Sequence, residues 1–176
     1  QHYNLKQFPS VNLHDIGNCA DVMIAVGGDG TMLGVARRVA PYHIPLVGIN
    51  QGHLGFITDI SLADAPSVLR EILYDQSYDA EARDLLHAQI IREGEVIYEG
   101  TALNDVVVGR TGMGGMLDLN VAVNGQFMYT ERADSLIIAT PTGSTAYSLA
   151  ANGPILHPKL AGITIASVAP QSLSNR

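Results

Sequence analysis

The chain has 176 residues, of which 47% are hydrophobic and 15% charged, with a formal net charge of −7 at pH 7 and a single cysteine. This composition predicts a folded protein with a sizeable core, and the acidic balance with scattered basic residues argues against a nucleic-acid-binding surface. No apolar run approaches the roughly 20 residues that span a bilayer, and one cysteine suits a reducing compartment, so we expect a soluble cytoplasmic protein.

The N-terminal part alternates strand-like and helix-like segments. An apolar run at 22–26 predicts a strand that ends in glycines, and the segment that follows places Met32, Ala36 and Val39 on one face of a helix. A second strand is predicted over 44–50, and a second amphipathic helix follows it. Because alternating strands and helices are typical of a parallel sheet, residues 1–80 are expected to form an α/β domain.

Strand patterns dominate after residue 80. The segment 85–100 predicts a hairpin that turns at Glu93 and Gly94, and alternating apolar residues from Leu117 lead to a second turn at Asn124-Gly125. Asn-Gly between two such runs is a strong hairpin signal, since both residues tolerate positive φ. Residues 81–176 are therefore expected to form a β-rich, sandwich-like domain.

The stretch AVGGDGTML, residues 25–33, places three glycines and one carboxylate between the first strand and the first helix. Helix-start amides, expected at Gly30, Thr31 and Met32, lack intrahelical partners and can bind phosphate oxygens. The motif is neither a Walker loop nor a dinucleotide fingerprint. Two interpretations of Asp29 stay open: it caps the helix, or it serves a phosphoryl transfer by accepting a proton or holding magnesium.

Two later segments carry polar side chains at strand ends. Asn104 and Asp105 stand at the mouth of an apolar strand, where they suit a base edge or ribose hydroxyls, or form a turn or cap. The segment RADSLIIATPTGSTAY runs an apolar strand into a hydroxyl-rich turn, with a helix predicted to begin at Ser144 or Thr145. That helix start is either a ligand site that includes the Tyr147 ring or an ordinary capped helix.

The motifs GGDGT, GINQGHLGF, ALND and TPTGSTAYSL, in this order and spacing, resemble the NAD kinase family, whose members phosphorylate NAD to NADP. The resemblance runs from about Asp21 to Arg176 and rests chiefly on TPTGSTAY, since lipid kinases and phosphofructokinases share GGDGT. It implies an α/β domain followed by a β-rich domain, ATP as phosphoryl donor with Mg²⁺, NAD as substrate, and homodimers or homotetramers. Family chains extend beyond both ends of this one, so the β-rich domain is expected to be incomplete at its C-terminus.

The resemblance also implies roles for individual residues. Asp29 resembles the general base that acts on the 2′-hydroxyl of the adenosine ribose. The glycine loop resembles the family's phosphate cradle, and Phe56 resembles a wall on the adenine side. Asn104 with Asp105 and the segment 145–150 resemble the parts that bind the dinucleotide. The residues expected to bind nucleotide are Gly27, Gly28, Gly30, Thr31, Phe56, Asn104, Asp105, Arg132, Asp134, Thr145, Ala146, Tyr147, Ser148, Leu149 and Ala150.

Three positions depart from the family pattern. Asp105 stands where Glu is usual, Ser135 where glycine is usual, and Gln171 where histidine is common. The first two departures favour an alternative, a nucleotide-binding module that has lost catalysis, whereas the intact Asp29 opposes it. A lipid or sugar kinase that shares the glycine loop is the second alternative. The histidines show no metal-ligand spacing, so no metal-binding residue is predicted.

Overall fold

The computed structural model describes residues 9–12, 15–52, 55–110, 112 and 115–171. The chain divides into two compact units, Gln1–Glu81 and Ala82–Arg176. The phosphate-binding role expected of the glycine turn in residues 1–80 and the NAD-binding role expected of residues 81–176 stay predictions.

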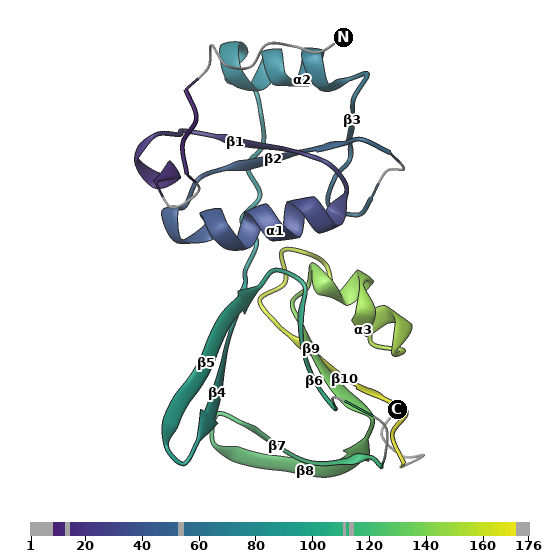
Figure 1. Ribbon diagram of the computed structural model, residues 1–176. Helices are drawn as coiled ribbons and strands as arrows, with labels where there is room; N and C mark the ends of the chain where they lie inside the picture. The colour runs from purple at the N-terminus through teal and green to yellow at the C-terminus, as the bar shows by residue number, and fades with distance from the viewer. Residues whose placement is uncertain (1–8, 13–14, 53–54, 111, 113–114, 172–176) are drawn as a thin grey trace. The chain divides into compact units, whose positions relative to one another are not determined.

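The first unit is a parallel three-stranded sheet in the order β1-β2-β3, with a helix on each face (Figure 1). Its helix α1 begins at Asp29 and buries the face formed by Met32, Ala36 and Val39, as the periodicity predicts. The expected α/β architecture with a parallel sheet is confirmed. The elements are η2 (Ile16–Asn18), β1 (Met23–Val26), α1 (Asp29–Val39), η3 (Ala40–Tyr42), β2 (Leu46–Asn50), β3 (Ile60–Ser61), α2 (Ala65–Arg70) and the π-helical turn η4 (Glu71–Asp75).

The second unit consists of two antiparallel hairpins, β4/β5 and β7/β8, and an antiparallel sheet in the order β10-β9-β6. Both predicted turns are present, because Glu93, Gly94, Asn124 and Gly125 all have positive φ, as type I′ turns require. The β-rich class is confirmed. The elements are β4 (Leu86–Arg92), β5 (Glu95–Ala102), β6 (Asp105–Gly109), β7 (Leu117–Val123), β8 (Gln126–Ala133), β9 (Ser135–Ala139), η5 (Gly143–Thr145), α3 (Tyr147–Ala150) and β10 (Thr164–Val168).

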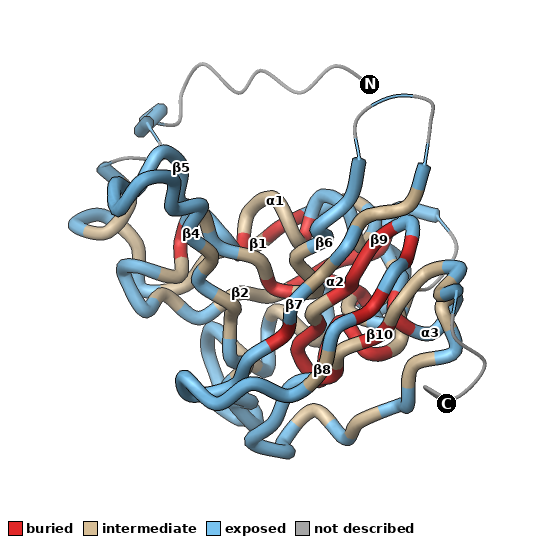
Figure 2. Tube along the Cα trace, turned by 90° about the horizontal axis from the view of Figure 1, so that it is seen from below, coloured by how far each residue is buried: buried red, intermediate tan, exposed pale blue. Residues whose placement is uncertain are grey.

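The core of the second unit lies along β9, which pairs with β6 on one side and β10 on the other. Ile137 at its centre is fully buried, and Figure 2 shows the buried residues following this strand. Ser135, which replaces the usual glycine of the family, is a buried strand residue and is not among the residues with positive φ, so the substitution is compatible with the backbone.

The β4/β5 hairpin contrasts with this core, since most of its residues are exposed (Figure 2). Its exposed large apolar side chains are Ile90, Ile91, Val96, Ile97 and Tyr98. Within the described residues, none of the helices combines the length and apolar character needed to cross a bilayer.

Candidate functional site

The carboxyl ends of β1 and β2 lie side by side in the first unit. Val26 pairs with Ile49, and the Gly27 amide donates a hydrogen bond to the Ile49 carbonyl at 2.9 Å. The glycine turn that leads into α1 and the loop that follows Asn50 therefore leave the sheet at the same edge. In α/β proteins this edge is where ligands bind.

The Asp29 carboxylate binds the segment 56–58, which follows β2. Its Oδ2 accepts a hydrogen bond from the Phe56 amide at 3.0 Å. Its Oδ1 accepts three, from the Ile57 amide at 3.3 Å, the Thr58 amide at 3.1 Å and the Thr58 hydroxyl at 2.9 Å. The N-cap of α1 is Gly28, and no side chain caps the helix. The helix-cap interpretation of Asp29 is therefore wrong.

These hydrogen bonds set the charge of Asp29. Burial would raise the pKa of its carboxyl group, but the bonds from the Thr58 hydroxyl and from the three amides outweigh that effect, so the pKa is lowered. Asp29 is therefore ionised at neutral pH and accepts hydrogen bonds only. Because a carboxylate oxygen offers about two lone-pair sites, Oδ1 is saturated by three donors, whereas Oδ2, with one donor, can accept another.

Gly55 allows this approach. A Cβ atom at position 55 would overlap the carboxyl group of Asp29, so any larger residue would displace either the loop or the carboxylate. Sequence reasoning singled out Phe56, which is 77% exposed, and missed Gly55 beside it. The signal was present in the motif NQGHLGF, which carries a second glycine directly before Phe56.

The helix-start amides differ from the prediction. The Thr31 and Met32 amides both donate to the Gly28 carbonyl, at 2.9 and 3.2 Å, because the N-cap residue presents this oxygen to the first turn of α1. The expectation that these two amides lack partners was wrong. Among the described residues, the amides of Asp29 and Gly30 meet no acceptor, so the anion-binding capacity of the turn lies there.

Gly28 and Gly30 border open space. A Cβ atom at either position would meet no atom within 4 Å, so the packing of the protein does not require glycine there. Glycine at such positions leaves room for a ligand to approach the backbone. At Gly27, in contrast, a Cβ atom would lie 2.7 Å from the Cβ of Thr31, so the packing of the turn itself requires glycine there.

Asn104 and the TPTG turn, residues 140–143, form one cluster in the second unit. Because β6 and β9 are antiparallel, the start of β6 lies opposite the end of β9, and Asp105 pairs with Ala139. The Asn104 carbonyl accepts the Thr140 amide at 2.8 Å, whereas its side-chain Oδ1 is buried with no partner among the described residues. An unpaired buried acceptor costs about 1–3 kcal/mol, a cost that a ligand donor would relieve.

Asp105 lies beside the start of α3. Burial raises the pKa of its carboxyl group, and a hydrogen bond from the Tyr147 backbone offsets part of that rise. Tyr147 is the first residue of α3, and 46% of its surface is exposed. The structure therefore brings Asn104, Asp105 and Tyr147 together, although they come from two separate motifs.

The hydroxyl-rich segment is more structural than its composition suggests. The helix begins at Tyr147, and Ser144 and Thr145 belong to the 3₁₀ turn η5, so the predicted helix start was two to three residues early. Ser148 is fully buried and shares a hydrogen bond with the Thr164 hydroxyl at 3.2 Å, so its side chain does not line an open surface of this unit. The roles expected of Thr145, Ala146, Leu149 and Ala150 stay predictions.

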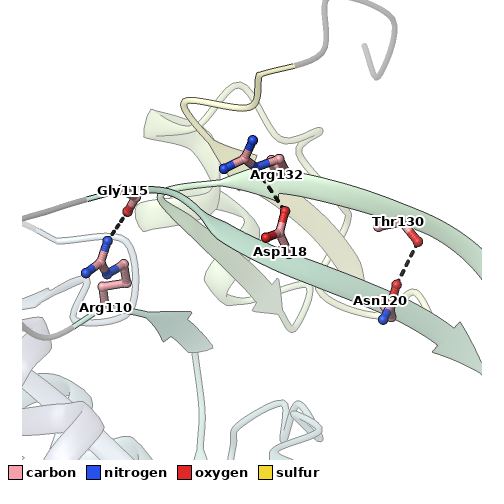
Figure 3. A network of polar contacts seen from close by, with 6 residues as sticks. All are labelled: Arg110, Gly115, Asp118, Asn120, Thr130 and Arg132. Carbon is pink, nitrogen blue, oxygen red and sulfur yellow. Dashed lines mark hydrogen bonds and ion pairs between the residues drawn. The ribbon is translucent and has the colours of Figure 1, made fainter.

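Arg132 and Asp134 lie at the end of the β7/β8 hairpin. Arg132 Nε pairs with Asp118 Oδ1 at 2.9 Å, and Figure 3 shows the two side chains facing each other across the strands. Both groups are exposed, and exposed pairs contribute little stability, so the pairing does not prevent Arg132 from meeting a ligand. The Asp134 side chain is exposed, and its amide donates to the Val168 carbonyl at 3.0 Å.

Two family models match the chain in succession. The ATP-NAD kinase N-terminal domain matches residues 7–78, and the ATP-NAD kinase C-terminal domain matches residues 103–176. The chain belongs to the NAD kinase family. Together the two matches include the glycine turn, Asn104 and the TPTGSTAY segment.

Individual NAD kinases show the same similarity. The chain is 51% identical over all 176 residues to an NAD kinase of Paraburkholderia phymatum, and 55% identical over 169 residues to one of Burkholderia pseudomallei. The two matches include 100% and 96% of this chain but only 58% and 56% of the relatives. The chain thus spans little more than half the length of these NAD kinases.

Two solved structures share the fold. The crystal structure of yeast NADH kinase complexed with NADH matches with a TM-score of 0.84 at 28% identity, covering 94% of this chain and 49% of that one. The crystal structure of an NAD kinase from Archaeoglobus fulgidus in complex with ATP matches with a TM-score of 0.77 at 26% identity, covering 93% and 61%. The NAD kinase fold therefore extends over nearly the whole chain.

Proposed function

We propose that the chain transfers a phosphoryl group from ATP to the 2′-hydroxyl of the adenosine ribose of NAD, giving NADP. The observation that carries the proposal is the GGDGT turn, which holds an ionised carboxylate beside the unpaired amides of Asp29 and Gly30 at the carboxyl ends of β1 and β2. Family membership and the relatives named NAD kinase support the choice of substrates.

In the proposed reaction, Asp29 Oδ2 accepts the proton of the 2′-hydroxyl as the hydroxyl oxygen bonds to the γ-phosphorus of ATP, and ADP leaves. The lowered pKa makes Asp29 a weak base. This is acceptable because phosphoryl transfer has a loose transition state, in which positioning and electrostatic stabilisation matter more than proton removal. The amides of Asp29 and Gly30, together with Gly27, Gly28 and Thr31, are proposed to line the phosphate side.

Magnesium is proposed to enter with ATP. Asp29 Oδ1 already accepts three hydrogen bonds, and no group of three or more His, Cys, Asp or Glu within the described part of the chain is arranged to hold a metal ion. These residues do not fit a site that the protein builds for magnesium. Mg²⁺ commonly keeps several waters and binds substrate phosphates, so we assign it no protein ligand.

The second unit is proposed to recognise NAD. The buried Asn104 Oδ1 lacks a donor. Asp105 follows it in the sequence, and the backbone of the partly exposed Tyr147 bonds the Asp105 carboxylate. An amide donor or ribose hydroxyl of the dinucleotide would satisfy Asn104. Arg132, Asp134 and the segment 145–150, apart from the buried Ser148 side chain, are proposed as further contacts of this unit, and Phe56 as a contact of the first unit.

The test is direct. The protein is incubated with ATP, Mg²⁺ and NAD, and NADP is measured with an NADP-specific dehydrogenase. NADP formation supports the proposal. Binding of both nucleotides without NADP would instead identify a module that has lost catalysis, and ATP hydrolysis stimulated by a lipid or sugar but not by NAD would identify a different kinase.

A glycine substitution separates ligand approach from folding. Gly30→Ala should leave the free energy of unfolding unchanged or raise it by up to about 1 kcal/mol, because alanine is the better helix former and its Cβ meets no protein atom. NADP formation should fall by at least about tenfold, because the methyl group occupies space proposed for phosphate. Thermal unfolding and the coupled assay measure the two effects. Unchanged turnover would contradict the placement of the phosphates.

We also propose that the chain forms a homodimer or homotetramer, as the family resemblance implies. The exposed apolar residues of the β4/β5 hairpin support association, since such patches mark interaction surfaces. Light scattering after size-exclusion chromatography would test it, and a monomer at micromolar concentration would contradict it. A cytoplasmic location stays a prediction of the composition.

A further inference from the structure

Thr58 joins Asp29 to a second buried side chain. It is 1% exposed, and its hydroxyl donates to Asp29 Oδ1 at 2.9 Å. The same hydroxyl accepts a hydrogen bond from Asn50 Nδ2 at 2.9 Å. Asn50, 3% exposed, ends β2, so the chain of contacts runs from the edge of the sheet to the carboxylate.

The direction of every bond in this chain follows from its donors. Asn50 Nδ2 can only donate, so the Thr58 hydroxyl must accept there and direct its single hydrogen to Asp29. The orientation of the Asn50 amide is set in turn, because its Oδ1 accepts the Gly52 amide at 2.7 Å and its Nδ2 also donates to the Thr58 carbonyl at 3.2 Å. The bonds thus run one way, from Gly52 through Asn50 and Thr58 to Asp29, and bonds aligned in this way strengthen one another.

The arrangement has a consequence for the two carboxylate oxygens. Three donors on Oδ1, one of them the Thr58 hydroxyl, leave Oδ2 as the oxygen with room for another hydrogen bond. The donor on Oδ1 from Thr58 comes from a buried residue, whereas the Phe56 amide that binds Oδ2 belongs to an exposed one.

We infer that Thr58 and Asn50 are positioning residues, which bind Asp29 Oδ1 and thereby present Oδ2 to the acceptor hydroxyl. The inference rests on the proposed function for the identity of that hydroxyl. Neither residue touches the reacting atoms in this assignment, so both act only through Asp29.

The decisive variant is Thr58→Val, which removes the hydroxyl and keeps a branched side chain of similar shape. Asn50 retains the Thr58 carbonyl as an acceptor, so the variant is expected to fold. The pKa of Asp29 should rise, because a hydrogen bond to its ionised form is lost, and turnover should fall by about 10- to 100-fold through misplacement of the carboxylate. Thr58→Ser restores the hydroxyl, so the pKa of Asp29 and the turnover should both return most of the way to their parent values.

Carboxyl ¹³C NMR titration of the whole chain measures the pKa of Asp29, and the coupled assay gives kcat and KM for NAD over a pH range. In Thr58→Val, kcat should fall more than KM changes, and the acidic limb of the kcat profile should move to higher pH. Asn50→Ala should also lower kcat and move the acidic limb to higher pH, each by a smaller amount. This second variant keeps the inference testable if Thr58→Val does not fold. Ser67→Ala is the matched control, since it deletes a hydroxyl that donates to the Asp64 carbonyl in the same unit.

An unchanged Asp29 pKa in Thr58→Val, or an unchanged kcat in an active protein, would overturn the inference. A loss of thermal stability with an unmoved pH profile would mean that Thr58 only packs, and would overturn it too. Failure of the proposed function is distinguishable. The parent chain could form no NADP while the Asp29 pKa still rises in Thr58→Val and recovers in Thr58→Ser. In that case Thr58 does position the carboxylate, and the proposed reaction is wrong.

Discussion

Asp29→Asn is expected to lower the turnover of NADP formation by about 10²- to 10⁴-fold, because the variant removes the proposed proton acceptor. Nucleotide binding should survive, and ATP affinity should hold or improve, since a negative charge beside phosphates is removed. The measurement is kcat together with nucleotide affinity across a magnesium titration. Turnover near that of the parent would show that Asp29 is not the base, and rescue by excess Mg²⁺ would show that it holds the metal.

The same variant has a structural cost that can be measured separately. Asparagine can keep one carbonyl oxygen at the position of Oδ1, but its amino group then meets the Phe56 amide, a donor facing a donor. The free energy of unfolding should fall by about 1 kcal/mol, because hydrogen bonds to a neutral oxygen are weaker than those to a carboxylate and the Phe56 amide, in a residue 77% exposed, can bond to water instead. Asp59→Asn is the matched control, because it neutralises a nearby exposed carboxylate and should change neither turnover nor stability.

Asp29 also predicts a pH dependence of stability. Because its pKa is lower in the folded chain than in the unfolded one, its stabilising contribution is complete above the pKa of an unfolded aspartate, about 3.9, and is lost as pH falls through the folded value. Asp29→Asn should therefore flatten the acidic side of the stability profile. A profile that falls as steeply as that of the parent would contradict this assignment.

Gly143→Ala is expected to be the most damaging single methyl group in the second unit. A Cβ atom there would lie 2.7 Å from the Cα of Asn104 and closer still to its carbonyl, and backbone cannot rotate away as a side chain can. The loss should be about 2–3 kcal/mol, which lowers the melting temperature by roughly 10–20 °C for a unit of this size.

The site should respond as well, because the displaced backbone is that of Asn104. NAD affinity should fall even at temperatures at which the variant is folded. Gly162→Ala is the control in the same unit, since its Cβ would make only an ordinary contact with Leu160, at 3.9 Å. Equal melting temperatures for the two variants would refute the close packing of the TPTG turn on Asn104.

Local sequence determined most of the secondary structure. The spacing of Met32, Ala36 and Val39 predicted the buried face of α1, and the Asn124-Gly125 pair predicted the turn between β7 and β8. These features depend on periodicity and on the φ angles that individual residues tolerate, which neighbouring residues already specify. The short strands β3 and β10 were not predicted, because their pairing with distant strands defines them.

Motif order likewise indicated the family, and with it Asp29, Asn104 and Asp105 as candidates for the site. Only the tertiary structure decided what these side chains contact. Asp29 bonds residues 27 to 29 positions away, so no local rule could show that it binds the loop instead of capping its helix. Ser148, one of a run of hydroxyl residues, is buried against Thr164 for the same reason. A polar side chain takes the partner that folding brings within hydrogen-bond distance, and that partner depends on how β2, β10 and their loops pack.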